Sequence, residues 1–111
     1  MITRAVVKGV GHYLPKRVVE NSEFEASIET SDAWIRSRSG IERRHFAEGD
    51  ETTSTMAAEA SRRALEAAGL TPQDGDAIVV ATSSPDHTFP SVATMVQAQI
   101  GANNAFAFDV Q

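Results

Sequence analysis

An unbroken apolar run, AIVVAT at residues 77–82, is the feature that most constrains how this chain folds. The run is rich in β-branched residues, which is typical of a strand buried on both faces of a parallel sheet. A second strand pattern, AFAFDV, follows at residues 105–110, after a helical segment at residues 91–100 that Gly101 ends. Because parallel strands require a crossover connection, this order predicts a right-handed β-α-β arrangement.

The residues upstream of this arrangement predict further helices and one more strand. Residues 52–68 carry alanines at i, i+3, i+4 spacing and form the clearest helix, which Gly69 ends. Residues 4–10 read as a short strand that is followed by a loop. The whole order predicts an α/β fold with a mostly parallel sheet and covering helices.

Two short helices are expected between these elements. Asn21 or Ser22 can cap the first, and Ser22 and Glu25 have the spacing of a capping box. Ser31 can cap the second, and Gly40 is well placed to end it.

The size and charge of the chain exclude several classes of function. Its 111 residues suffice for one small domain, and no apolar run has the length of a membrane span. Since the chain has neither a membrane span nor the apolar core of a signal peptide, a cytoplasmic location is expected. A formal net charge of −5 argues against general nucleic-acid binding. The chain contains no cysteine, which excludes disulfides, thiolate metal sites and a cysteine nucleophile within it.

Most of the polar motifs predict no chemistry. The three histidines lack metal-ligand spacing, so no metal site is expected, and the loop residues Ser83, Ser84, Asp86 and His87 do not amount to a catalytic triad. Gly9 and Gly11 follow a strand pattern but lack the third glycine and the helix of a dinucleotide fingerprint.

One basic cluster departs from the acidic balance. The segment SDAWIRSRSGIERRHF, residues 31–46, holds the only tryptophan, Trp34, and four of the chain's ten lysine and arginine residues. On a helix, Trp34 and Arg38 share a face, and this pair suits a ligand with a flat base and phosphates. From the spacing alone, a core tryptophan covered by arginines through cation–π contacts is the favoured alternative.

The residues of this cluster and of three later segments resemble a known enzyme family. TSDAWIRSRSGIERRH, ETTSTMAAEASRRALEAAGL, IVVATSSPDHTFPS and AFAFDV together are similar to the N-terminal part of β-ketoacyl-acyl-carrier-protein synthase III. The similarity extends over essentially all of the chain. It implies the N-terminal portion of a thiolase-like fold, so residues 1–111 are expected to be an incomplete part of a condensing-enzyme subunit.

The resemblance implies roles for five residues. In the family the tryptophan stacks on the adenine of coenzyme A and the arginine four residues later reaches its phosphates, which corresponds to Trp34 and Arg38 here. Thr30 would line the adenine site, and Ser39 stands at the mouth of the pantetheine tunnel, where the family often has threonine. Phe89 matches the phenylalanine that crosses the dimer interface and shapes the partner's acyl pocket.

The reaction implied by the resemblance is the condensation of acyl-CoA, usually acetyl-CoA, with malonyl-acyl-carrier protein at the start of fatty-acid synthesis. The implied assembly is a homodimer, acyl-CoA is a substrate, and no cofactor is expected. The nucleophilic cysteine would lie about three residues beyond Gln111, and the catalytic histidine and asparagine in a C-terminal part of the subunit. The chain is therefore expected to bind CoA and to be inactive alone, with no catalytic residue of its own.

Three alternatives remain open from the sequence. The chain could serve a related acyltransferase of a specialised pathway, such as the priming of a polyketide or a signal molecule. It could also be a non-catalytic module that binds coenzyme A or a partner protein. A nucleic-acid binder that uses the Arg–Trp cluster is a third reading, which a salt-dependence test would settle.

Overall fold

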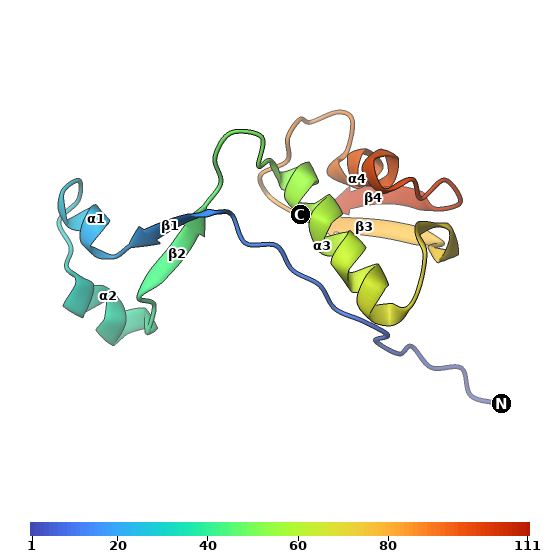
Figure 1. Ribbon diagram of the computed structural model, residues 1–111, viewed down its shortest axis with the longest axis horizontal. Helices are drawn as coiled ribbons and strands as arrows, with labels where there is room; N and C mark the ends of the chain where they lie inside the picture. Colours follow the sequence, from blue (N-terminus) through green and yellow to red (C-terminus); the bar gives the residue numbers. More distant parts are fainter. The chain divides into compact units, whose positions relative to one another are not determined.

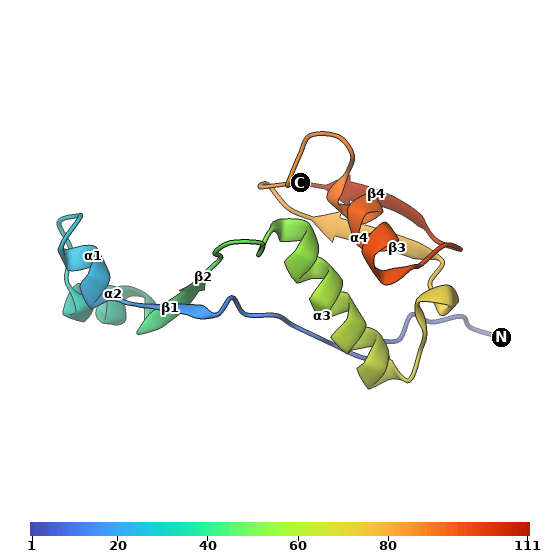
Figure 2. The same ribbon diagram turned by 45° about the horizontal axis from the view of Figure 1, so that its top comes forward.

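The computed structural model describes all residues, 1–111, and divides them into two compact units. The first unit comprises Met1–Tyr13 together with Asp50–Gln111, and the second comprises Leu14–Gly49. Figure 1 and Figure 2 show the elements of each unit from two directions. We describe each unit by itself.

The first unit is built on a parallel pair of strands, β3 (Ala77–Ala81) and β4 (Phe106–Val110). Helix α4 (Val92–Ile100) connects these strands, and helix α3 (Thr53–Ala68) packs beside α4, as both ribbon views show. A short 3-10 helix, η1 (Pro72–Asp74), leads into β3. The predicted β-α-β arrangement is therefore confirmed, with α4 between β3 and β4. The separate helix predicted at residues 52–68 is confirmed as α3.

The core of this unit lies between the two helices and one face of the sheet. Ala58 of α3 and Val92 and Val96 of α4 are fully buried, and Ile78 and Val80 of β3 pack against them. The opposite face of the sheet is open: Val79 is 53% exposed, and the outward side chains of β4 are exposed as well. The prediction that residues 77–82 are buried on both faces is thus wrong for this chain, because nothing in it covers the second face.

The first residues of the chain were expected to include a strand at residues 4–10, and this prediction is also wrong. Residues 1–13 form no regular element, since no strand of the chain pairs with them. They lie against α3 instead, and the two glycines of this segment permit the approach. A Cβ atom on Gly9 would lie 2.7 Å from the Ala64 carbonyl oxygen, and one on Gly11 would lie 2.4 Å from the Ala60 carbonyl oxygen.

The second unit is an antiparallel strand pair with two short helices. Strand β1 (Arg17–Glu20) pairs with β2 (Arg43–Phe46), and α1 (Ser22–Glu25) and α2 (Asp32–Ser39) lie between them in sequence. Both helices were predicted, but neither strand was. The basic segment at residues 31–46 is thus divided between two elements: its first part forms α2, and RRHF forms strand β2.

Candidate functional site

Helix α2 presents the candidate site, and local signals define its ends. The Ser31 hydroxyl accepts a hydrogen bond from the Trp34 backbone N–H at 3.1 Å, which caps the first turn. Gly40 takes a left-handed conformation, with φ of 72°, and its N–H donates to the Arg36 carbonyl at 2.8 Å. The bounds predicted for this helix are confirmed. No residue of α2 is buried, so apolar packing contributes little to its position.

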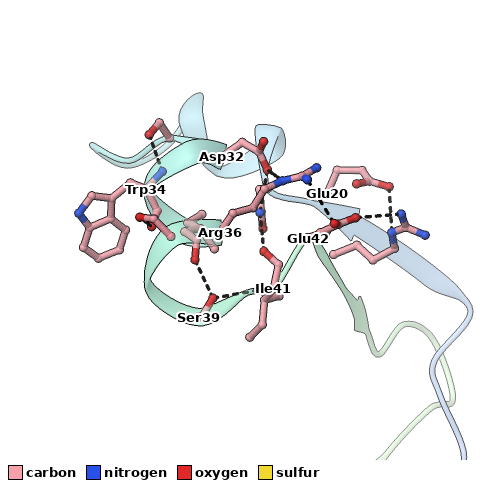
Figure 3. A network of polar contacts seen from close by, with 12 residues as sticks. Glu20, Asp32, Trp34, Arg36, Ser39, Ile41 and Glu42 are labelled. Carbon is pink, nitrogen blue, oxygen red and sulfur yellow. Dashed lines mark hydrogen bonds and ion pairs between the residues drawn. The ribbon is translucent and has the colours of Figure 1, made fainter.

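The Trp34 side chain lies on the surface and not in a core. The indole is 57% exposed and, in Figure 3, points away from the polar contacts of the helix. The Arg38 guanidinium carbon lies 5.6 Å from the centroid of the indole, within the range of a cation–π contact. The alternative reading of this cluster is therefore half right: the cation–π contact is present, but the tryptophan is exposed.

The four arginines of the cluster differ in what they contact. Arg36 pairs with Asp32 at 2.9 Å and with Glu42 at 3.2 Å, and Arg43 lies within ion-pair distance of Glu20 and Glu42. Arg44 donates to the Asn21 side chain at 2.8 Å.

Arg38 alone among the four has no carboxylate or hydrogen-bond partner in this structure. Three of the cations thus have polar partners within the unit. The fourth stands free beside an exposed ring, where an anionic group can approach it.

A shallow hollow of about 230 Å³ lies beside the indole. Its lining brings together two of the residues predicted from the resemblance, Thr30 and Trp34, with Glu29 and Ser31. Ser39 lies at the other end of α2, where its hydroxyl donates to the Ile35 carbonyl at 2.8 Å and accepts from the Ile41 N–H at 3.1 Å (Figure 3). The role of Ser39 at a pantetheine tunnel stays a prediction, as do the roles of Thr30, Trp34 and Arg38.

Asn21 is the residue of this unit that sequence reasoning misjudged. It was one of two residues expected to cap α1, with Ser22 as the other, but its side chain makes no cap there. It is almost fully buried, at 1% exposure, and bonds to Asp32 at the start of α2 and to Ile41 just after its end. The sequence showed only that an asparagine lies near a helix start. An asparagine can either cap a helix or, when buried, join separate segments through its amide, so its type did not distinguish the two roles.

Phe89 belongs to the first unit and projects from the loop that precedes α4. It is 87% exposed and lines a hollow of about 420 Å³ beside the end of β4, together with Asp109, Val110 and Gln111. An aromatic side chain this exposed contributes little to the core of its own chain. The expectation that Phe89 reaches a partner subunit stays a prediction.

The loop that carries Phe89 is anchored to α3 by Asp86. Its carboxylate accepts hydrogen bonds from the Ser54 backbone N–H at 2.8 Å and from the Ser54 hydroxyl at 2.7 Å. Burial raises the pKa of Asp86, but hydrogen bonds from Ser54 and Thr52 outweigh it and hold the pKa below its ordinary value. Asp86 thus links the loop to α3, as expected of a polar loop residue. The expectation that Ser83, Ser84, Asp86 and His87 form no triad stays a prediction.

The lowered pKa of Asp86 predicts a loss of stability in acid. A depressed folded-state pKa stabilises the fold above the unfolded value of about 3.9, and this contribution is lost as the pH falls through the folded pKa. We expect the free energy of unfolding of the wild type to fall below about pH 4 more steeply than that of Asp86→Asn, which cannot ionise. Urea denaturation between about pH 6 and pH 3 measures both slopes, and equal slopes would contradict the prediction.

No group of three or more histidine, aspartate or glutamate residues is placed to hold a metal ion. None of the helices has both the length and the apolar composition of a membrane span.

Comparison with known sequences shows similarity over the full chain. No protein-family model matches. The β-ketoacyl-[acyl-carrier-protein] synthase III of Rhodobacter capsulatus is 69% identical over 111 residues, and that of Roseobacter denitrificans is 67% identical. The chain spans about a third of the length of these curated relatives, 34% in both cases.

Comparison with solved structures shows the same fold. The 3-oxoacyl-[acyl-carrier-protein] synthase III of Aquifex aeolicus matches with a TM-score of 0.87 and 45% identity, over 92% of this chain and 33% of that one. The priming β-ketosynthase of the R1128 polyketide pathway matches with a TM-score of 0.89 and 42% identity, over 94% of this chain and 31% of that one. The chain is therefore similar in sequence and in fold to about a third of these thiolase-fold β-ketoacyl-acyl-carrier-protein synthases.

Proposed function

We propose that this chain supplies the coenzyme A-binding part of a 3-oxoacyl-acyl-carrier-protein synthase III. The complete enzyme would condense acyl-CoA, with acetyl-CoA as the expected substrate, with malonyl-acyl-carrier protein and so initiate fatty-acid synthesis. The observation that carries the proposal is the free Arg38 guanidinium beside the exposed Trp34 side chain.

The chemistry of this pair suits coenzyme A. A purine stacks on an exposed indole, and a guanidinium binds phosphate through two parallel hydrogen bonds. Arg38 is the cation of α2 that is available to a phosphate, because Arg36, the other arginine of the helix, is paired with Asp32 and Glu42. A nucleotide with several phosphates is therefore attracted to one point of a chain whose formal net charge is −5.

The rest of the reaction is assigned to groups outside these residues. Acyl transfer by a ping-pong route needs a thiolate nucleophile, and this chain contains no cysteine. We infer that the chain alone is inactive and that the catalytic residues come from a C-terminal part of the same subunit. The proposal includes a cytoplasmic homodimer in which Phe89 helps to shape the acyl pocket of the partner, and it needs no cofactor besides the acyl-CoA substrate.

A specialised condensing enzyme is the second candidate. The match to the priming β-ketosynthase of a polyketide pathway, at 42% identity, is the observation that supports it. The two candidates share the CoA site and differ in the acyl group that they accept. Comparing acetyl-CoA with longer and branched acyl-CoA substrates in the same assay therefore distinguishes them.

The test is acyl transfer from labelled acetyl-CoA by the complete gene product that contains these residues. We expect Trp34→Ala and Arg38→Ala each to lower kcat/KM for acetyl-CoA about 10- to 100-fold, or about 1–3 kcal/mol, because each removes a stacking or charge-assisted contact. Arg43→Ala is the matched control, since its exposed ion pairs contribute little. Unchanged kinetics in both variants would remove the CoA assignment from α2, and binding of CoA without any transfer would leave a non-catalytic module.

A further inference from the structure

We propose that Asn21 is the positioning residue of the site on α2: its buried side chain sets the pose of the helix and thereby of Trp34 and Arg38. The inference rests on the proposed function for the identity of the ligand. Asn21 itself lies outside α2, directly before α1, and is not expected to touch the ligand.

Every polar atom of the Asn21 side chain is used, and its partners lie on different segments. The Nδ2 group donates to the Asp32 carboxylate at 2.9 Å and to the Ile41 carbonyl at 2.7 Å, while Oδ1 accepts from Arg44 at 2.8 Å. The Asn21 backbone N–H also donates to the Glu42 carbonyl at 3.3 Å. One side chain therefore connects the first turn of α2, the residue that follows its C-cap, and strand β2.

These contacts matter because α2 has little else to hold it. The helix has eight residues, none of them buried, and a helix of this length is marginal in water without tertiary contacts. Besides Asn21, its first turn is tied by the Asp32 backbone N–H, which donates to Glu25 of α1 at 2.9 Å. The indole of Trp34 and the free guanidinium of Arg38 are exposed and do not hold the helix in place.

The charges around the contact strengthen it. Asp32 Oδ1 accepts from both Asn21 and Arg36, and Arg36 also pairs with Glu42 (Figure 3). The hydrogen bonds from Asn21 and then from Arg36 hold the pKa of Asp32 below its ordinary value, so this carboxylate is ionised at neutral pH. A buried amide that donates to an ionised acceptor makes one of the stronger kinds of hydrogen bond in proteins.

A near-isosteric substitution tests the inference directly. Asn21→Asp keeps the shape and the acceptor for Arg44, but it removes both donors and sets a carboxylate against Asp32. We expect KM for acetyl-CoA to rise about tenfold or more, because a small displacement of a positioned group is costly. We expect KM for malonyl-acyl-carrier protein, and kcat at saturating acetyl-CoA, to stay unchanged in the complete gene product. A role in folding alone would lower kcat and the amount of active enzyme for both substrates.

Binding of coenzyme A itself gives a second readout, because Trp34 is the only tryptophan in this chain. Quenching of its fluorescence by CoA should weaken about tenfold in Asn21→Asp, and amide hydrogen exchange of α2 should become faster. Asn103→Asp, which adds the same charge at an exposed position of the first unit, should leave both unchanged. Tryptophans outside residues 1–111 are replaced by phenylalanine in every variant compared.

A second pair of variants applies if Asn21→Asp does not fold. Asp32 is half exposed, so its replacement leaves no buried group without a partner except Asn21 itself. Asp32→Ala should weaken CoA binding as Asn21→Asp does, whereas Asp32→Asn keeps an acceptor for Asn21 and should bind nearly as well as the wild type. The double variant Asn21→Asp, Asp32→Asn reverses the donor and acceptor and should recover part of the lost affinity.

The outcomes separate the two proposals. A wild type that binds CoA, with folded Asn21→Asp and Asp32→Ala variants that bind it equally well, would overturn the positioning role and leave the CoA site in place. A wild type that neither binds CoA nor uses acetyl-CoA would overturn both. A selective rise of KM for acetyl-CoA, with partial recovery in the double variant, supports both.

Discussion

Replacing Gly11 with alanine is expected to destabilise the first unit by about 3 kcal/mol or more. The added Cβ atom would lie 2.4 Å from the Ala60 carbonyl oxygen and 2.4 Å from the Ala64 backbone nitrogen of α3. Both are backbone atoms of a regular helix and cannot turn aside as a flexible side chain can. The segment must therefore separate from α3, and the packing between them is lost. Urea denaturation of the purified protein measures the change.

The control for this substitution is Gly75→Ala. Its Cβ atom would have the Pro72 carbonyl oxygen as its only close neighbour, at 3.4 Å, and the φ of −79° suits any residue. A glycine replaced where the backbone is compatible changes stability by less than about 1 kcal/mol, often favourably. If Gly11→Ala behaves like Gly75→Ala, the residues 1–13 do not pack on α3 as the structure places them.

The contact with α3 also explains why residues 9 and 11 are glycine, which the sequence alone did not. As a dinucleotide fingerprint, Gly9 and Gly11 were weak, and in the structure both lie against the backbone of α3. Their spacing matches the alanines of the facing helix: Gly11 lies at Ala60 and Ala64, and Gly9 at Ala64 and Ala68. The alanine pattern predicted the helix, because periodicity is a local property. It could not show which of the alanines would be covered by a backbone some fifty positions away in the chain.

The same division between local and distant interactions runs through the fold. The ends of α2 were predicted well because Ser31 and Gly40 each act on the adjacent turn of the helix. The side-chain cap expected for α1 is absent. Strands β1 and β2 were missed because each depends on a partner more than twenty residues away. Residues 4–10 have the composition of a strand but find no partner in this chain.

The candidate site shows how far each kind of reasoning reaches. The spacing of Trp34 and Arg38 predicted a shared helix face, and the structure confirms their contact. Spacing could not show that the indole is exposed or that Arg38 is the arginine without a carboxylate partner, because both depend on the neighbouring strands. The CoA-binding roles came from family resemblance, and kinetics must test them.

Replacing Asp109 with alanine is the second change with a large expected effect. Its carboxylate accepts hydrogen bonds from the Val92 N–H at 2.7 Å and the Ala93 N–H at 2.8 Å, the first two amides of α4. Ser91 accepts only from the third, Thr94. Val92 and Ala93 are fully buried, so both amides would lose their partner away from water. We expect a loss of about 2–4 kcal/mol in the free energy of unfolding.

Two further substitutions make this prediction specific. Asp109→Asn keeps one acceptor oxygen and should lose about half as much stability, while Asp76→Ala removes an exposed carboxylate from the same unit and should change little. The Phe89 loop leads directly into α4, whose first two amides Asp109 of β4 holds. If Phe89 shapes an acyl pocket, Asp109→Asn should alter the preference among acyl-CoA chain lengths more than it alters CoA affinity. A loss of stability with an unchanged chain-length preference would show that the Asp109 hydrogen bonds stabilise α4 without affecting the acyl pocket.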